Sequence, residues 1–303
     1  RAPIYDRAKR WEPDRPMVGN ENWNQWHEWK AILDRPFIAG MFTWTGIDYM
    51  GEANAKWPVK GTGSGMLDVA GFEKPSFHFM RSIWSDTPAT RLFTQRLADS
   101  RYDADGAERE PGAWRKGKWF WYDVARHWQY EPGESVIVEA YSNRPQLELK
   151  LNGKSLGVKR LEDFEDRVYR WCVPYEPGEL TVEGDHLATP GEPAAVRLSL
   201  DHTHIPADGR SVVHGVAQIV DVEGRPVTTE EHDLRVDING PLRLLGVDNG
   251  ANDNVQPFQS DRITTAHGRC LFIAQATDVA GQTAITVSST GLASARVTVQ
   301  TGG

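Results

Sequence analysis

Residues 35–52 read RPFIAGMFTWTGIDYMGE. The apolar part of this run, residues 37–42, has the length of a short strand and leads into Trp44. The loop that follows carries Asp48 and Glu52. Because loops at the ends of parallel strands commonly carry ligand-binding side chains, this run is a candidate site as well as a fold signal.

A second short apolar segment lies upstream, at residues 16–19, and leads into Asn20 and Glu21. The chain therefore has two predicted strand ends, and each is followed by acids and tryptophans. This pattern indicates a sugar site at the mouth of an α/β barrel.

The first 84 residues alternate such segments with helical patterns. Tryptophans at 23, 26 and 29, with Leu33, recur at intervals of three and four and predict an amphipathic helix over 22–34. A second helix is predicted over 77–84. The order strand, helix, strand, helix favours a parallel α/β construction. Because four elements cannot cover both faces of a parallel sheet, we interpret this part as a piece of a barrel.

The middle of the chain changes character. Residues 98–118 are about half charged and are predicted to be a solvated loop or linker. From Trp119 the apolar residues recur with a period of two. The clearest signal is Asn152-Gly153 between two alternating segments, which predicts a hairpin with a type I′ turn. Short strands continue through 196–200, and the spacing indicates an antiparallel sandwich.

A second series of predicted strands begins near Ile205 and continues to the end of the chain. The strand candidates are 212–220, 234–238, 242–247, 270–275, 283–287 and 295–299, with glycine-containing turns between them. This part is predicted to be a second sandwich.

Composition excludes several classes of function. The 303 residues carry a net charge of −8 and no basic stripe, which argues against nucleic acid as a partner. No apolar run approaches the length of a membrane span, so we expect no membrane. Cys172 and Cys270 are interpreted as free core thiols. We expect no cofactor and no metal.

One feature left a metal alternative open. Asp248, Asn249 and Asp253 could suggest calcium, although Asn and Asp beside a glycine are commoner as turn residues. The histidines at 202, 204 and 214 match no zinc spacing.

Three groups of passages carry a resemblance to a known family. GNENW (19–23), the run 35–52 and WPVKGTGSGMLDVAGFEKPSFHFMRSIW (57–84) resemble the end of the catalytic barrel in glycoside hydrolase family 2, the β-galactosidase group. HWQYEPGESVIVEAYSN (127–143) with LELKLNGKSLG (147–157) resembles the immunoglobulin-like domain that follows the barrel in one bacterial branch. Residues 191–299 resemble the last sandwich domain of that branch.

The resemblance implies the fold class and the domains. We expect the C-terminal piece of a TIM barrel over 1–88, an immunoglobulin-like β-sandwich over 89–199 and a second one over 200–303. It also implies an extracytoplasmic location, as in bacterial relatives that degrade polysaccharides.

The implied function is that of a retaining exo-β-glycosidase, with β-galactosidase as the leading specificity. Such enzymes use two carboxylates, a nucleophile and an acid/base. Glu21 matches the family nucleophile at the end of barrel strand seven. The alternative for Glu21 is a first-turn helix acid capped by Asn20.

The acid/base of the family precedes the nucleophile by about three barrel strands. The 20 residues before Glu21 contain only Asp6, Glu12 and Asp14, and none of these ends a predicted strand. We therefore expect the acid/base to lie outside this chain and the isolated chain to be inactive. The expected partners are a carbohydrate substrate and the missing N-terminal part of the barrel, or a second copy of the chain.

Further binding residues follow from the last predicted strand. Trp44 resembles the tryptophan that floors the sugar pocket, with a barrel-core tryptophan as the alternative. Asp48 and Glu52 could accept hydrogen bonds from sugar hydroxyls, with loop solvation or capping as the alternative. Asn54 and Lys56 form an N-x-K triplet, which contacts a uronic carboxylate in related β-glucuronidases.

Two other functions stay open. One is a β-glucuronidase-type hydrolase, which the N-x-K triplet favours. The other is a non-catalytic protein that binds carbohydrate or serves a structural role, because two of the three predicted domains are sandwiches.

Overall fold

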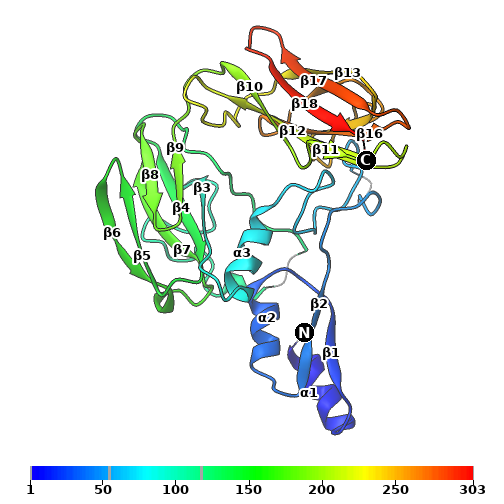
Figure 1. Ribbon diagram of the computed structural model, residues 1–303. Coiled ribbons are helices and arrows are strands. Elements are labelled where there is room, and N and C mark those ends of the chain that lie inside the picture. The colour runs from blue at the N-terminus through cyan, green and yellow to red at the C-terminus, as the bar shows by residue number, and fades with distance from the viewer. Residues whose placement is uncertain (1, 54–55, 117–118, 303) are drawn as a thin grey trace. The chain divides into compact units, whose positions relative to one another are not determined.

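The computed structural model describes residues 2–53, 56–116 and 119–302 (Figure 1). Its contacts divide the chain into two units. The first comprises residues 1–52 and 61–189, and the second comprises residues 53–60 and 190–303. Strands hold 41% of the chain and helices 11%, so the fold is mostly β.

The first unit begins with an α/β segment. Its elements are α1 (Ala2–Trp11), β1 (Met17–Asn22), α2 (Trp26–Leu33), β2 (Ile38–Thr43) and α3 (Pro75–Trp84). The strands β1 and β2 pair in parallel, with Asn22 opposite Thr43, and α2 is the connection between them. The predicted order strand, helix, strand, helix is confirmed for these elements, and β1 and β2 form a sheet of two strands.

Two helix boundaries differ from the sequence prediction. The helix predicted over 22–34 begins at Trp26, because Asn22 is the last residue of β1 and Gln25 is the N-cap. The helix α3 begins at Pro75, two residues earlier than predicted. A proline suits the first turn, where its missing N–H has no helical partner to lose. The helix α1 was not predicted.

The first sandwich follows α3. Its strands are β3 (Thr90–Arg96), β4 (Ser135–Ser142), β5 (Gln146–Leu151), β6 (Lys154–Arg160), β7 (Tyr169–Pro174), β8 (Glu179–Val182) and β9 (Asp185–Ala188), with short 3-10 helices η1 (Ala113–Arg115) and η2 (Leu161–Asp163). They form the sheets β3-β4-β7 and β6-β5-β8-β9. The side chains of Trp128, Leu149 and Leu180 are fully buried in its core.

The hairpin signal of the first sandwich is confirmed. Asn152 and Gly153 connect β5 to β6 with φ angles of 51° and 77°, the left-handed values that a type I′ turn requires at both positions. Asparagine and glycine tolerate these values better than other residues do.

The prediction of a solvated linker over 98–118 is wrong at Ser100 and Tyr102, which are buried. Tyr102 is fully buried, and its phenol donates a hydrogen bond of 2.7 Å to Asp166. The guanidinium of Arg170 donates to the same carboxylate over 2.8 Å. Since Asp166 lies more than sixty residues away, local composition gave no sign of this contact.

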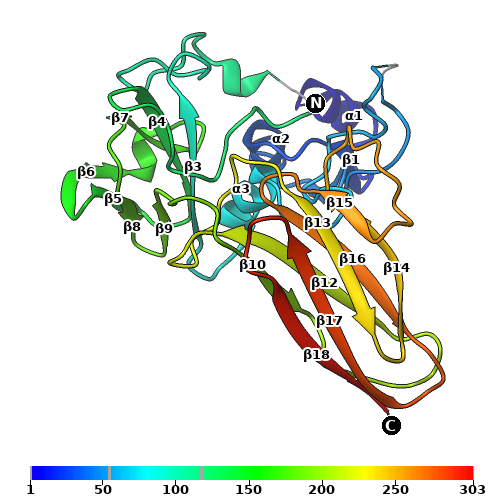
Figure 2. The ribbon, with the colours of Figure 1, turned by 90° about the horizontal axis from the view of Figure 1, so that it is seen from above.

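The second unit is a sandwich of two sheets, and their strands pair antiparallel except for one short parallel pair within one sheet. Its strands are β10 (Ala195–Leu200), β11 (His204–Ile205), β12 (Val212–Val220), β13 (Asp233–Asn239), β14 (Leu242–Asp248), β15 (Arg262–Thr264), β16 (Arg269–Ala276), β17 (Gly281–Ser289) and β18 (Ala295–Thr301). They form the sheets β10-β12-β16-β14 and β11-β18-β17-β13-β15, which Figure 2 shows from above.

One strand was assigned to the wrong sheet. Residues 196–200 were predicted to continue the first sandwich, but β10 pairs with β12 of the second sandwich, with Leu198 opposite Ala217. The period of two identifies a strand but does not identify its partner, so the alternation alone could not decide this assignment, whereas the resemblance of residues 191–299 to a terminal sandwich agrees with the observed pairing.

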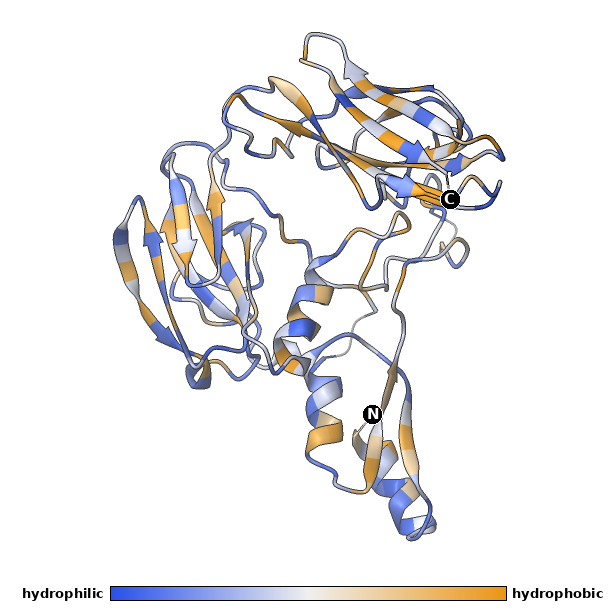
Figure 3. Cartoon of the chain, viewed as in Figure 1, coloured by the Kyte–Doolittle hydropathy of each residue, from blue (hydrophilic) through white to orange (hydrophobic). Residues whose placement is uncertain are grey.

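The strands of the sandwiches alternate hydrophobic and hydrophilic residues (Figure 3). In β16 the buried residues are Cys270, Phe272, Ala274 and Ala276. Phe272 lies over Gly215 of β12, where an added Cβ would come within 2.0 Å of the ring. This close approach requires glycine at position 215.

The sequence analysis also made predictions about the cysteines and about membrane-spanning segments. Both cysteines are free thiols, and burial raises the pKa of Cys270 to about 12. Among the helices of the described residues, none has the length and apolar character needed to cross a membrane.

Candidate active site

The parallel pairing of β1 and β2 brings two predicted site residues to neighbouring strand ends. The main-chain N–H of Trp44, which follows β2, donates a hydrogen bond of 2.8 Å to the main-chain oxygen of Asn22. Glu21 precedes Asn22 in β1. The carboxyl ends of parallel strands are where side chains from different strands converge on a ligand.

Glu21 has an exposed side chain and a backbone φ of 52°. This left-handed conformation is unfavourable for a residue with a side chain by about 1 kcal/mol or more. Such strain persists only where the surrounding structure imposes it, and it is concentrated at functional sites. Because α2 begins at Trp26 with Gln25 as its N-cap, Glu21 is not a first-turn helix acid, and that alternative is wrong.

A buried polar network lies beside Glu21. The amide of Asn22 donates to the carboxylate of Glu28 over 2.6 Å and to the phenol oxygen of Tyr5 over 3.0 Å. Asn22 is fully buried and Glu28 is 2% exposed. These contacts, from α1 and α2, fix the end of β1. The sequence analysis missed them because it placed Asn22 in a helix.

Aromatic and acidic side chains gather in the loop after β2. The rings of Trp44 and Tyr49 meet edge to face, with centroids 5.9 Å apart. The phenol of Tyr49 donates a hydrogen bond to the carboxylate of Glu52. Glu52, like Glu21, has a left-handed backbone, with φ 50°. We call Glu21, Trp44, Tyr49 and Glu52 the strand-end cluster.

The pKa of Tyr49 depends on the other residues of this cluster. The pKa of Tyr49 is raised, first by its hydrogen bond to Glu52, then by burial, and further by the negative charges of Glu52 and Glu21. A hydrogen bond with Trp44 acts in the opposite direction. The other three residues of the cluster therefore influence the phenol of Tyr49, which stays protonated and able to donate. The sequence analysis did not assign Tyr49 a role.

Asp48 has a different environment. It is 4% exposed, its carboxylate lies 2.8 Å from the ammonium of Lys74, and it accepts a hydrogen bond of 2.6 Å from the N–H of Gly65. An added Cβ on Gly65 would lie 2.3 Å from the main-chain nitrogen of Asp48, so the two loop segments touch. These contacts fit the capping alternative, in which Asp48 holds the loop that carries Tyr49 and Glu52. Its predicted substrate role stays a prediction.

The N-x-K triplet is described only in part. Asn54 lies outside the described residues. Lys56 is exposed and belongs to the segment 53–60 of the second unit. In that segment the N–H of Lys60 donates to the main-chain oxygen of Asn252 over 2.8 Å, and its ammonium lies 4.4 Å from the ring centre of Phe258. The uronate-binding role of the triplet stays a prediction.

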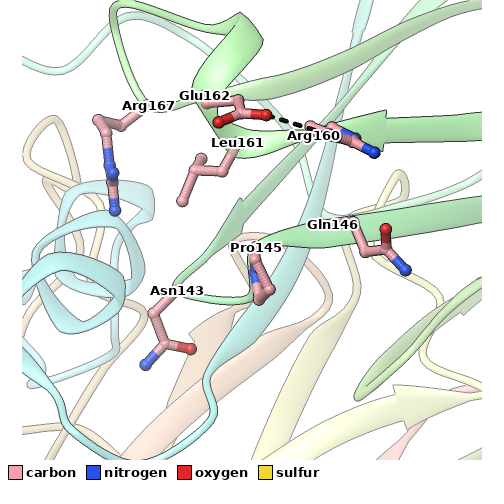
Figure 4. A pocket seen from close by; sticks show the side chains of 7 residues that line it. All are labelled: Asn143, Pro145, Gln146, Arg160, Leu161, Glu162 and Arg167. Atoms are coloured by element: carbon pink, nitrogen blue, oxygen red, sulfur yellow. Dashed lines mark hydrogen bonds and ion pairs between the residues drawn. The ribbon is translucent and has the colours of Figure 1, made fainter.

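A cavity of about 460 Å³ lies at one end of the first sandwich (Figure 4). Its lining residues are Asn143, Pro145, Gln146, Arg160, Leu161, Glu162 and Arg167. The guanidinium of Arg160 pairs with Glu162 over 3.3 Å, and burial lowers the pKa of Arg167. No residue of the strand-end cluster lines this cavity.

The side chains that could bind a metal are distributed across residues 2–53, 56–116 and 119–302. Within the described residues, no three His, Cys, Asp or Glu side chains gather closely enough to hold an ion. At the turn considered for calcium, Asp248 accepts a hydrogen bond from the N–H of Gly250 over 3.1 Å, and Asn249 accepts one from Ala251 over 3.0 Å. These are the contacts of turn residues.

Comparison with known families gives two matches. Residues 196–298 match the glycoside hydrolase family 2 C-terminal domain 5, and residues 133–186 match a domain of unknown function, DUF4982. The first match covers most of the second sandwich, and the second match lies within the first sandwich.

Comparison with curated proteins gives two informative relatives. The β-galactosidase BoGH2A of Bacteroides ovatus is 28% identical over 283 residues, which are 89% of this chain and 29% of that protein. A putative β-glucuronidase of Formosa agariphila is 25% identical over 80% of this chain and 22% of its own length. The chain therefore spans less than a third of these relatives.

Solved structures agree with this relationship. A glycosyl hydrolase family 2 member from Bacteroides cellulosilyticus superimposes with a TM-score of 0.87 at 26% identity, over all of this chain and 41% of that one. A β-glycosidase from Bacteroides vulgatus gives 0.74 at 26% identity, over 90% and 32%.

Proposed function

This chain belongs to glycoside hydrolase family 2 and corresponds to the C-terminal part of its members, and we propose that it supplies the nucleophile of a retaining exo-β-glycosidase. The observation that carries the proposal is the placement of Glu21. Its carboxylate is exposed at a strained position of β1, beside the end of a parallel strand that leads into Trp44. A rigidly held, ionised carboxylate is what attack on an anomeric carbon requires.

We propose that β1, α2, β2 and α3 are the last βα units of a (β/α) barrel. Parallel pairing through a helical crossover and the clustering of Glu21, Trp44 and Glu52 at the strand ends support this assignment. In such barrels the catalytic residues come from the carboxyl ends of several strands. The remaining barrel strands would then belong to the full-length protein that carries this chain.

In the proposed reaction, a carboxylate oxygen of Glu21 forms a bond to the anomeric carbon as the bond from that carbon to the leaving oxygen breaks. A carboxylic acid, about 5–5.5 Å from Glu21 and contributed by another part of the full-length protein, gives its proton to the leaving oxygen. Water then attacks the glycosyl ester, passes a proton to the same carboxylate and releases Glu21.

Other members of the cluster have binding roles in this proposal. The indole of Trp44 offers an apolar face to the C–H face of the sugar. Glu52 accepts hydrogen bonds from sugar hydroxyls, and Tyr49 holds the Glu52 carboxylate in place through its phenol. The raised pKa of Tyr49 keeps this phenol protonated at neutral pH.

For the substrate we propose a terminal β-galactoside of an oligosaccharide or polysaccharide, met outside the cytoplasm. The relative BoGH2A, named as a β-galactosidase, aligns with 89% of the chain and supports this choice. The second candidate is a β-glucuronide, supported by the Formosa relative and by the Asn54–Lys56 triplet.

The test is covalent trapping of Glu21 in the full-length protein. An activated 2-deoxy-2-fluoro-β-galactoside, and in parallel the corresponding glucuronide, is added, and the protein is analysed by intact mass and peptide mapping. We expect one added sugar on the peptide that contains Glu21, and the reagent that labels identifies the sugar. A protein with Glu12→Gln, an exposed acid away from β1, is expected to label in the same way. A label on another acid, or none with either sugar, would disprove the assignment.

A further inference from the structure

The segment between β3 and β4 of the first sandwich reaches back to the residues that follow β1. The short helix η1 packs against α2, and the ring of Trp119 lies 5.2 Å from the ring of Trp23 at an interplanar angle of 65°. Trp23 follows Glu21 by two residues, and all of these residues belong to the same unit. We infer that Trp119 and Trp23 form an aromatic subsite for the leaving saccharide, beside the proposed nucleophile.

The burial of β1 places Glu21 and Trp23 on accessible surface. Asn22, between them, is fully buried and bound to Glu28 and Tyr5. Glu21 is exposed and Trp23 is half-buried. The backbone therefore turns the Asn22 side chain inward, and the residues on either side of it are less buried.

The exposure of Trp119 is not that of a core residue. Its side chain is 42% exposed, and the neighbouring Phe120 is 46% exposed, whereas Trp128 in the core of the same sandwich is fully buried. In an edge-to-face pair the edge of one ring covers one face of the other, and Trp23 makes a second such contact with His27 at 6.1 Å, so the exposed ring surface of the pair belongs mainly to Trp119. Exposed aromatic faces suit the apolar C–H faces of a pyranose, and a sugar is the partner expected next to a glycosidase nucleophile.

This inference rests on the proposed function and extends it to the leaving group. The nucleophile binds the anomeric carbon, so the saccharide attached to that carbon extends away from Glu21. Trp44 follows β2 and Trp23 follows β1, so the two strand ends present aromatic side chains on separate segments. We assign Trp44 to the terminal sugar and the pair Trp23–Trp119 to the next sugar.

The chain contains a matched control for Trp119. Trp84, at the end of α3, is also 42% exposed and also meets another tryptophan edge to face, Trp29 at 5.8 Å and 77°. Trp29 lies on α2, further along the chain from Glu21 than Trp23 does. Neither Trp29 nor Trp84 has a role in the proposed site. A variant at position 84 therefore removes the same kind of ring with the same exposure.

The experiment measures transfer to an acceptor sugar. The full-length protein is trapped as its 2-fluoroglycosyl ester on Glu21 and freed of reagent, and recovery of activity is followed at increasing concentrations of methyl β-galactoside. In this step an acceptor hydroxyl attacks the anomeric carbon, the ester bond to Glu21 breaks, and the hydroxyl proton passes to the acid/base carboxylate. The acceptor concentration at half-maximal recovery reports binding in the subsite for the leaving sugar.

We expect Trp119→Ala and Trp119→Leu to require about tenfold more acceptor, the effect of exposing roughly 60 Å² of apolar surface. Trp119→Tyr, which keeps a flat ring, should stay close to the wild type, and Trp84→Ala should match the wild type. An unchanged acceptor dependence in both Trp119→Ala and Trp119→Leu would overturn the inference while leaving the proposed function intact. Failure of the wild-type protein to take any label would overturn the proposed function, and the inference with it.

Discussion

The main-chain N–H of Trp44 donates to the main-chain oxygen of Asn22 over 2.8 Å, so the last residue of β1 and the first residue after β2 are fixed side by side. On the β1 side, Asn22 is held by Glu28 and Tyr5. On the β2 side, Trp44 packs against Tyr49. The strained residue Glu21 therefore lies where two rigid segments meet, and this rigidity explains how the strain is maintained.

The strained backbone at Glu21 predicts that replacing this residue by glycine raises stability and lowers activity. Glu21→Gly should raise the free energy of unfolding by about 1 kcal/mol, because glycine adopts φ 52° without a steric penalty. The same change should lower turnover by at least about 10⁴-fold, since it removes the proposed nucleophile. Urea unfolding and steady-state kinetics of the full-length protein measure the two effects.

The control for this trade is Glu12→Gly, at an exposed position just after α1 where the structure has no positive φ. It should not stabilise the protein and should keep its activity. Equal turnover in Glu21→Gly and the wild type would refute the catalytic assignment.

The ion pair between buried Asp48 and half-buried Lys74 predicts a large loss of stability when the lysine is removed. Lys74→Met leaves the carboxylate of Asp48, whose side chain is 2% exposed, without its ammonium partner, and should lower the free energy of unfolding by about 3 kcal/mol. The double variant Asp48→Asn/Lys74→Met should recover part of this loss. Chemical denaturation followed by tryptophan fluorescence is the measurement.

A matched surface pair gives the comparison. The ammonium of Lys30 on α2 lies 3.0 Å from the carboxylate of Asp34, the C-cap of that helix, but these side chains are 46% and 51% exposed. Lys30→Met should change stability by less than about 0.5 kcal/mol. Equal effects of Lys30→Met and Lys74→Met would show that the pair at Asp48 does not anchor the loop.

His78 predicts a pH dependence of stability in the first unit. Burial in α3, with the positive charges of Arg91 and Arg126, lowers its pKa from 6.5 to about 3, and Glu73 lies 3.3 Å from its ring nitrogen. Because the unfolded chain takes up the proton first, the stability that neutral His78 supplies is complete above pH 6.5 and is lost as the pH falls toward 3.

The expected slope for this single group is about 1.4 kcal/mol per pH unit within that window. In His78→Gln, which cannot take up a proton, the slope should be smaller by about that amount. Urea unfolding at a series of pH values, followed by tryptophan fluorescence, tests this. The fluorescence reports mainly on the first unit, because eleven of the 12 tryptophans belong to it and only Trp57 lies in the second. Parallel pH profiles of variant and wild type would contradict the prediction.

The contact between Gly215 and Phe272 predicts that a smaller side chain at position 272 partly offsets the loss of stability caused by a larger one at position 215. Gly215→Ala should lower the free energy of unfolding by about 1–3 kcal/mol, because the new methyl would overlap the ring. In the double variant Gly215→Ala/Phe272→Leu the loss should be smaller than the sum of the two single losses. Far-ultraviolet circular dichroism during urea unfolding follows this unit, which has few tryptophans. Additive losses would argue against the contact.

The sequence predicted the sandwiches better than the candidate site. The strand predicted over 212–220 agrees with β12 at both ends, because burial on one face imposes a strict period of two. The parallel strands and the position of Glu21 at a strand end were also predictable. The partner of β10 was not, because pairing depends on residues distant in the chain.

The chemistry around the site depended on such distant partners as well. The position of Asp48 in the loop after a strand suggested a ligand-binding role, but the ammonium of Lys74, 26 residues later, pairs with its carboxylate. Tyr102 lay in a highly charged segment, yet Asp166 and Arg170 bury it. The strain at Glu21 and Glu52 has no sequence signal, because neither residue is glycine or asparagine. Side-chain types gave the candidates, and only tertiary contacts distinguished anchoring from exposed acids.

The grouping of residues 53–60 with the second unit has a consequence for how such proteins can be recombined. This stretch is encoded inside the first unit, but Lys60 is bound by Asn252 and Phe258. A gene fusion with one junction near residue 190 would bring in a foreign terminal sandwich and leave the eight-residue stretch without its matching surface. Exchange of this module, in the laboratory or in evolution, therefore needs two coordinated replacements rather than one.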